Sequence, residues 1–140
     1  MRVILDTNVL LGALISPHGA PETIYRAWRE GRFELVTAPV QLEELRRASR
    51  YPKLKTILPA HRIGTMVNNL QHAVVLERLS PLPQDIELND PNDTFLLAMA
   101  LDGEADYLVT GDRRAGLLRR GRIGRARILT PGTFCAEALK

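Results

Sequence analysis

The first ten residues, Met1-Arg-Val-Ile-Leu-Asp-Thr-Asn-Val-Leu10, contain a short apolar run that is followed at once by an acid. The run from Val3 to Leu5 includes two β-branched residues and is typical of a strand buried on both faces. A carboxylate at the end of such a strand must be paired, protonated or bound to a cation. Because ligands bind at the carboxyl ends of strands in parallel α/β sheets, Asp6 is the first candidate for a functional residue.

The rest of the chain alternates between strand and helix patterns. We expect strands at 2–5, 33–36, 73–77, 107–110 and 126–129, and helices at 7–15, 21–30, 38–50, 59–69, 90–102, 115–119 and 133–139. Thr37 is expected to cap the third helix, and Asp90 is expected to cap the helix after the loop at 80–89. This alternation predicts an α/β fold, in one domain over residues 1–140, with a central, mainly parallel sheet.

Composition places few limits on function. Of the 140 residues, 45% are apolar and 25% are charged, as in an ordinary globular domain. The longest fully apolar run, from Phe95 to Leu101, is too short to cross a bilayer. A single cysteine, Cys135, excludes an internal disulfide and fits a reducing compartment. We therefore expect a cytoplasmic protein without a membrane segment.

The net charge of +3 is unevenly distributed, in two basic clusters. One spans residues 113–127 and holds seven arginines and no acid. The other comprises Arg46, Arg47, Arg50, Lys53 and Lys55. Each cluster could be a solvated helix face or loop, or it could bind phosphate, since arginine forks suit phosphate oxygens. Composition leaves both interpretations open.

Two further acids are candidates to meet Asp6. Asp112 follows the apolar strand at 107–110 and one glycine, which repeats the pattern around Asp6. Parallel strands bring their carboxyl ends to one edge of the sheet, so the two acids are expected to lie close together. Asp93 shares a helix face with apolar residues and is expected to point inward. The plainer alternatives are that Asp112 is a turn or cap residue and that Asp93 is favoured by the helix dipole.

The third helix supplies the fourth acid. Glu43 lies on the same face as the arginines that follow it, at steps of three and four residues, and is expected to pair with them in solvent. Glu44 lies on the flank of the apolar stripe and is expected to point toward the interior. A lone glutamate at such a position is usually a boundary residue. Its interest depends on whether other acids face it.

Several carboxylates at one point repel each other unless a cation neutralises them. Mg²⁺ prefers such oxygen ligands, and it can promote phosphodiester hydrolysis. The three histidines lack zinc-ligand spacing and are expected at the surface or its boundary: His18, His61 and His72. The residues alone therefore indicate a site for a hard divalent cation.

Four segments together resemble a known family. They are Val3-Ile-Leu-Asp-Thr-Asn-Val-Leu10, Ala38-Pro-Val-Gln-Leu-Glu-Glu-Leu45, Asp90-Pro-Asn-Asp-Thr-Phe-Leu-Leu-Ala98 and Leu108-Val-Thr-Gly-Asp112. In this order and spacing the chain resembles a PIN domain, of the prokaryotic kind that includes the VapC-type toxins of toxin–antitoxin pairs. The resemblance implies an α/β/α sandwich with a central parallel sheet. It also implies an Mg²⁺- or Mn²⁺-dependent ribonuclease that hydrolyses RNA phosphodiester bonds.

The resemblance also assigns residues to roles. The catalytic, metal-binding acids would be Asp6, Glu44, Asp93 and Asp112. Supporting polar residues would be Asn8, Thr110 and the cap Asp90. The arginines that follow Asp112 in sequence would contact the RNA backbone: Arg113, Arg114, Arg119 and Arg120. Implied partners are an RNA substrate, an antitoxin protein and a second copy in a homodimer.

Two other interpretations stay open at this point. The chain could be a catalytically inactive PIN-fold module that binds nucleic acid or protein, although its acid set is complete. A phosphatase of the haloacid dehalogenase type also begins with a strand-end aspartate. That family requires a second aspartate two residues later, where this chain has Asn8.

Overall fold

A parallel sheet forms the centre of the molecule. The computed structural model describes residues 1–86, 94–111 and 116–139, and within them the sheet has six strands in the order β3-β2-β1-β4-β6-β5. The neighbouring strands are parallel except β5 and β6. The strands are β1 (Arg2–Leu5), β2 (Glu34–Thr37), β3 (Val74–Val75), β4 (Tyr107–Val109), β5 (Arg122–Ile123) and β6 (Ala126–Leu129).

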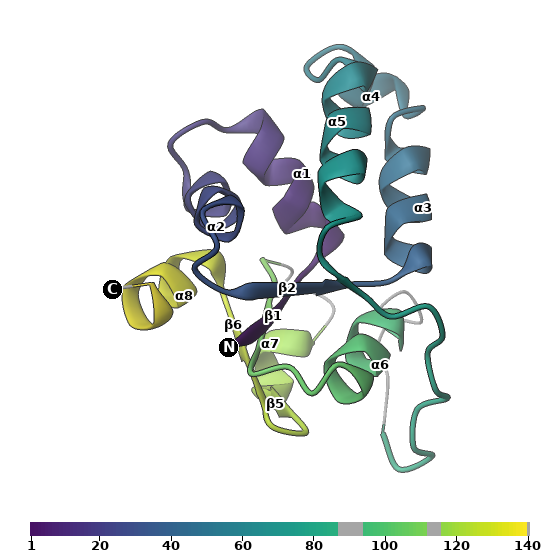
Figure 1. Ribbon diagram of the computed structural model, residues 1–140, viewed down its shortest axis with the longest axis vertical. Helices are drawn as coiled ribbons and strands as arrows, with labels where there is room; N and C mark the ends of the chain where they lie inside the picture. The colour runs from purple at the N-terminus through teal and green to yellow at the C-terminus, as the bar shows by residue number, and fades with distance from the viewer. Residues whose placement is uncertain (87–93, 112–115, 140) are drawn as a thin grey trace.

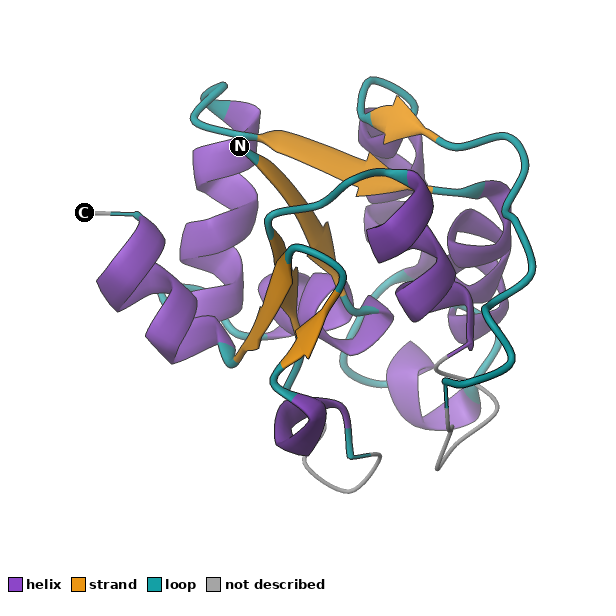
Figure 2. Ribbon diagram, turned by 90° about the horizontal axis from the view of Figure 1, so that it is seen from below, coloured by secondary structure: helices purple, strands orange, loops and turns teal. Residues whose placement is uncertain are grey.

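Helices cover both faces of this sheet. The described helices are α1 (Thr7–Ile15), α2 (Ala20–Arg29), α3 (Pro39–Ala48), α4 (Pro52–Lys55), α5 (Ala60–Leu70), α6 (Thr94–Asp102), α7 (Leu117–Arg120) and α8 (Pro131–Ala138). Figure 1 shows α1, α2, α3 and α5 on one side of β2 and α6 on the other, and Figure 2 shows the strands between helices. None of the helices within the described ranges is long and apolar enough to cross a membrane.

Alternate residues of each strand belong to different cores, because successive side chains of a strand point to opposite faces. Val3 and Leu5 pack with α1, α2, α3, α5 and α8. Ile4, between them, packs with α6 and α7. The apolar run that opens the chain is therefore buried on both faces, as the sequence predicts. The predicted α/β/α sandwich with a mainly parallel sheet is confirmed.

The strand order reverses direction beside β1. From β1 the chain builds outward through β2 and β3, and it then returns to the other side of β1 to form β4. In open α/β sheets a crevice forms at such a switch point, at the carboxyl ends of the strands, and ligands bind there. Asp6 follows β1 and Thr110 follows β4, so both residues lie at this place.

A buried polar network fixes the carboxyl end of β1 to α3. Gln41 is 1% exposed, and its Nε2 donates a hydrogen bond of 2.7 Å to the carbonyl oxygen of Leu5. The hydroxyl of Thr37, also buried, donates to Oε1 of Gln41 at 2.7 Å. Both polar groups of the amide are thereby used, and the strand end next to Asp6 is held in place.

This network corrects the predicted role of Thr37. Thr37 is the last residue of β2, and Ala38 stands at the N-cap of α3 without a side-chain hydrogen bond to the helix. Pro39 in the first turn lacks an N–H, which reduces the need for a cap. The sequence pattern identified the helix start but assigned the threonine hydroxyl to the wrong partner.

Two short elements were not predicted. The third helix ends at Ala48 rather than near residue 50, and Pro52 begins the separate one-turn helix α4. The two-residue strand β5 pairs with β6 through a turn that contains Gly124, with φ of 56°. Each element spans only about one period of an apolar pattern, which is too short for the sequence pattern to indicate it.

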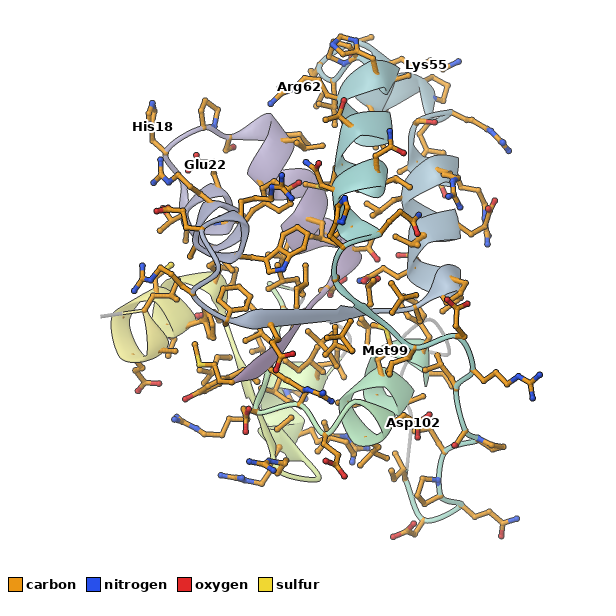
Figure 3. The ribbon with its side chains drawn as sticks, viewed as in Figure 1. His18, Glu22, Lys55, Arg62, Met99 and Asp102 are labelled. Atoms are coloured by element: carbon orange, nitrogen blue, oxygen red, sulfur yellow. The ribbon has the colours of Figure 1, made fainter. Side chains whose placement is uncertain are left out.

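The predicted end of the helix at Gly103 is confirmed, and its cause is close packing. A Cβ at this position would lie 2.8 Å from the carbonyl oxygen of Met99 and 2.9 Å from a methyl carbon of Val36. Figure 3 shows Met99 on the sheet side of α6 and Asp102 pointing away from it. Glycine at 103 thus lets the end of α6 approach β2.

At the amino-terminal edge of the sheet, opposite the switch point, Asp106 connects the start of β4 to the start of β1. Its backbone N–H donates to the carbonyl oxygen of Arg2, and its carboxylate accepts from the backbone N–H of Arg2, each at 2.8 Å. Arg125 reaches the other carboxylate oxygen at 2.9 Å. The Arg2 N–H, and to a smaller extent Arg125, lower the pKa of Asp106 below its usual 3.8, against an opposing effect of burial.

Replacing Gln41 by leucine should destabilise the fold. The substitution keeps the volume but leaves the Leu5 carbonyl and the Thr37 hydroxyl buried without their partner, which costs about 2–4 kcal/mol in the free energy of unfolding. Urea unfolding measures the effect. The control is Gln71→Leu on the exposed end of α5, expected to change stability by less than about 0.5 kcal/mol. Equal effects of both substitutions would contradict the network.

Asp106 should make the free energy of unfolding depend on pH in the acidic range. Because its pKa is lower in the folded state, the group stabilises the fold above the unfolded-state pKa, and this stability is lost as pH falls through the folded-state pKa. At neutral pH, Asp106→Asn should destabilise by about 1 kcal/mol, since a neutral acceptor binds more weakly than a charged one. Urea titrations should show the two proteins converging below about pH 4. A constant difference across that range would contradict the assignment.

Candidate functional site

Asp6 lies at the switch point with its carboxylate held from two sides. The side chain is 8% exposed. Its Oδ2 accepts a 2.7 Å hydrogen bond from the hydroxyl of Thr110, and its Oδ1 accepts a weaker one, 3.3 Å, from the backbone N–H of Asn8. The backbone N–H of Asp6 donates to the carbonyl oxygen of Val109 at 2.9 Å, which continues the pairing of β1 with β4.

The same residue begins the first helix. Asp6 is the N-cap of α1, with extended backbone angles of −56° and 146° and with the hydrogen bond from Asn8 closing the cap. The amino end of a helix favours a negative charge, because its backbone N–H groups point outward and the helix dipole is positive there. The local structure thus gives an ionised Asp6 a defined orientation. Asn8 contributes its backbone N–H, and its own side chain is exposed.

Glu43 and Glu44 lie on different faces of α3, as the helical pattern predicts. Glu43 is exposed and forms ion pairs with Arg46 at 3.8 Å and with Arg47 at 4.0 Å. Glu44 is half-buried and lies three residues after Gln41, the residue that reaches the end of β1. Residues three apart lie on the same side of a helix. Glu44 therefore belongs to the side of α3 that faces the carboxyl edge of the sheet.

A groove with a volume of about 510 Å³ contains Glu44. It runs between α3, the segment at 79–82 and the start of α6. Its lining residues are Val40, Glu44, Arg47, Leu79, Ser80, Pro81, Leu82, Thr94, Phe95 and Ala98. The lining is mainly apolar, with Glu44 and Arg47 as its charged groups. The groove extends from the flank of α3 to Thr94, the first residue of α6.

Several predicted site residues lie outside the described residues. These are Asp90, Asp93, Asp112, Arg113 and Arg114. The structure does describe Asp6, Glu44, Asn8 and Thr110, and it brings Asp6, Asn8 and Thr110 into direct contact. Within residues 1–86, 94–111 and 116–139 no group of three or more His, Cys, Asp or Glu side chains could hold a metal ion. The four-acid site therefore stays a prediction.

The described arginines between residues 113 and 127 differ in their contacts. Arg119 and Arg120 are exposed on α7. Arg125 pairs with Asp106 at the amino-terminal edge of the sheet, and Arg127 pairs with Glu137 of α8 at 3.3 Å. These two arginines therefore have structural partners. Within the described part of this run, Arg125 and Arg127 belong to two different ion pairs.

Sequence reasoning missed three polar residues near Asp6. Gln41 and Thr37 form the buried network that holds the end of β1. Thr7, in the first turn of α1, is buried, and its hydroxyl has no hydrogen-bond partner among the described residues. The available signal was a glutamine one helical turn before Glu44, on a side of the helix that should be apolar. The three histidines are exposed, as expected.

The donor chemistry around Asp6 fits a hard divalent cation. The polar side chains close to it offer oxygen: the carboxylate of Asp6 itself and the hydroxyl of Thr110. Glu44 contributes a second carboxylate on the neighbouring helix. Oxygen ligands of this kind are preferred by Mg²⁺ and Mn²⁺ over thiolate or imidazole.

Comparison with solved structures supports the fold. The chain matches a chain of the VapBC2 complex of Rickettsia felis, which is bound to a DNA fragment from its promoter. The TM-score is 0.59, and the match covers 93% of this chain and 98% of that one, at 15% sequence identity. At this identity the similarity concerns the fold alone.

Comparison of the sequences identifies the family. An uncharacterized protein of Methanocaldococcus jannaschii is 28% identical over 114 residues, which cover 81% of this chain and 72% of that protein. The model of the PIN domain family matches residues 2–114. This region includes Asp6, the groove and the switch point between β1 and β4. The chain belongs to the PIN domain family.

Proposed function

We propose that this protein is an Mg²⁺- or Mn²⁺-dependent ribonuclease that hydrolyses RNA phosphodiester bonds. The observation that carries the proposal is the buried carboxylate of Asp6, oriented by Thr110 across the switch point of the sheet. PIN domains are typically metal-dependent nucleases, and the resemblance of the sequence motifs assigns an acid of this chain to each of the four positions.

Four acids and their neighbours have distinct tasks in this proposal. Asp6, Asp93 and Asp112 hold the cation, and Glu44 either joins them or orients the attacking water. Thr110 keeps the Asp6 carboxylate in position through its hydroxyl. The bound cation supplies charge stabilisation and activation of water for attack on the phosphorus. The groove next to Glu44 would receive the part of the RNA chain beside the cleaved bond.

We further propose that the ribonuclease is the toxin of a toxin–antitoxin pair. The structural match is to a complex named as a VapBC pair, so a neutralising antitoxin is the partner that this likeness suggests. A homodimer is a further expectation, which a monomeric mass in light scattering would contradict. We place the activity in the cytoplasm, because the single cysteine, Cys135, is a free, half-buried thiol that fits a reducing compartment.

Replacing Asp6 by asparagine should abolish cleavage. Asparagine keeps one oxygen that can accept the cap hydrogen bond from Asn8, and its amide group can donate to the hydroxyl of Thr110. It removes the charge that holds the cation, so the rate of RNA cleavage in Mg²⁺ or Mn²⁺ should fall by about 100-fold or more. The measurement is cleavage of labelled RNA during a metal titration, with circular dichroism to confirm the fold. Asp85→Asn, an exposed acid in the loop, is the control and should retain activity. Undiminished cleavage by Asp6→Asn in a clean preparation would refute the assignment.

The two adjacent glutamates of α3 provide a second, matched test. Glu44→Gln should lower the cleavage rate by about 10-fold or more, because a ligand or water-orienting group is lost. Glu43→Gln removes the same charge one residue away, on the exposed face, and should leave the rate nearly unchanged. Single-turnover kinetics compare the two. A greater loss from Glu43→Gln would show that the wrong face of α3 was assigned to the site.

The inactive PIN-fold module predicts a different outcome. Such a protein would bind RNA or another protein but would show no metal-dependent cleavage, and Asp6→Asn would not change its behaviour. The same cleavage assay therefore distinguishes the two functions. No contact among the described residues favours the inactive module.

A further inference from the structure

One long segment of the chain carries positive charge only. Between Leu45 and Leu76 there is no aspartate or glutamate. The same segment contains six cations: Arg46, Arg47, Arg50, Lys53, Lys55 and Arg62. A globular domain in which a quarter of the residues are charged normally mixes both signs on its surface. Solubility alone therefore does not explain why this segment carries positive charge without any acid.

The segment folds into a helical hairpin that projects from the sheet. α3 leads away from the carboxyl end of β2, α5 returns beside it, and α4 forms the far end (Figure 1). Leu45 and Ala48 of α3 and Ile63 and Met66 of α5 are in the same apolar core. The inner face of the hairpin is thus used in packing. Its cations are left for the outside and the far end.

Four cations gather toward this far end, and we call them the hairpin cations: Arg50, Lys53, Lys55 and Arg62. All four are exposed, and none of them takes part in an ion pair among the described residues. Lys55 and Arg62 both lie at the outer end of the hairpin in Figure 3, away from the sheet. Positive groups without acidic neighbours favour a polyanionic partner.

The same end exposes two large side chains. Tyr51 is 56% exposed and Ile57 is 58% exposed, more than any other large apolar residue that the structure describes. The turn around them is locally ordered, since Ser49 and Thr56 donate to the carbonyl oxygens of Arg46 and Lys53. An exposed tyrosine among cations suits a nucleic-acid strand, because its ring can stack on a base while the cations contact phosphates.

Helix α3 connects this end to the candidate site. Glu44 and Arg47 line the groove, and Arg50 lies two residues beyond the end of the same helix at Ala48. At 1.5 Å per residue, the helical part from Glu44 to Ala48 rises about 6 Å, and Arg50 follows shortly after it. An RNA chain lying in the groove could therefore continue along α3 to the hairpin cations without leaving the positive surface.

We propose that the end of the hairpin is an RNA-binding surface that holds the substrate backbone beyond the cleavage site. The inference rests on the proposed ribonuclease function, since it assumes that RNA reaches the groove. Charge decides between RNA and a second copy of the chain as the occupant. Two hairpin ends would bring eight like charges together, and like charges repel, whereas phosphates neutralise them.

The test measures binding separately from cleavage. In the Asp6→Asn background, a labelled single-stranded oligouridylate is titrated at several salt concentrations. The hairpin variant is Lys53→Gln, Lys55→Gln and Arg62→Gln combined. It should bind more weakly, and the slope of log affinity against log salt should become shallower by about 2, because three phosphate contacts are lost. The single reversal Lys53→Glu should weaken binding in the same direction.

The matched control removes equal charge elsewhere. Arg26→Gln, Arg29→Gln and Arg32→Gln combined lie on and after α2, a different part of the surface, and should leave the salt slope unchanged. A hairpin variant that binds like this control overturns the inference. So does one that binds RNA normally but changes from dimer to monomer, which would assign the surface to a second copy. Absence of metal-dependent cleavage by the wild type, with binding still lost in the hairpin variant, refutes the ribonuclease function and leaves the RNA surface standing.

Discussion

The hydrogen bond from the hydroxyl of Thr110 to the carboxylate of Asp6 joins the two halves of this molecule. Asp6 follows β1 and Thr110 follows β4, two strands that are adjacent in the sheet but separated by 104 positions in the sequence. A carboxylate that is 8% exposed is costly unless its oxygens are satisfied, and this contact satisfies one of them. This contact forms only when β1 and β4 are paired, so the proposed site depends on the same strand pairing as the fold.

The structural acid Asp106 and the proposed catalytic acids Asp6 and Glu44 lie at opposite edges of the sheet. At the amino-terminal edge, Asp106 is satisfied by the backbone of Arg2 and by Arg125, and it joins the strands there. At the carboxyl edge, Asp6 lies at the switch point and Glu44 lines a groove. Both edges carry buried or half-buried carboxylates. Ligands of open α/β sheets bind at the carboxyl ends of the strands, which is why we place the proposed chemistry at this edge.

The sequence was a good guide wherever a pattern extended over several residues. The run Val3–Leu5 indicated a strand buried on both faces, and the steps of three and four in α3 separated Glu43 from Glu44. The prediction from sequence was wrong where one side chain had two possible hydrogen-bond partners. Thr37 was expected to cap α3, but its hydroxyl contacts Gln41, because β2 extends one residue further. Arg125 and Arg127 belong to one arginine cluster in the sequence but pair with different acids in space.

The sequence by itself determined the α/β class, the family resemblance and the identity of the candidate acids, because apolar periodicity and motif spacing are local properties of the chain. Only the tertiary structure decided that Thr110 orients Asp6, that Gln41 secures the end of β1, and that the cations after Glu44 lie on a projecting hairpin. These facts concern residues that are distant in sequence or that compete for partners. Such contacts depend on strand order and helix packing, and no local pattern encodes them.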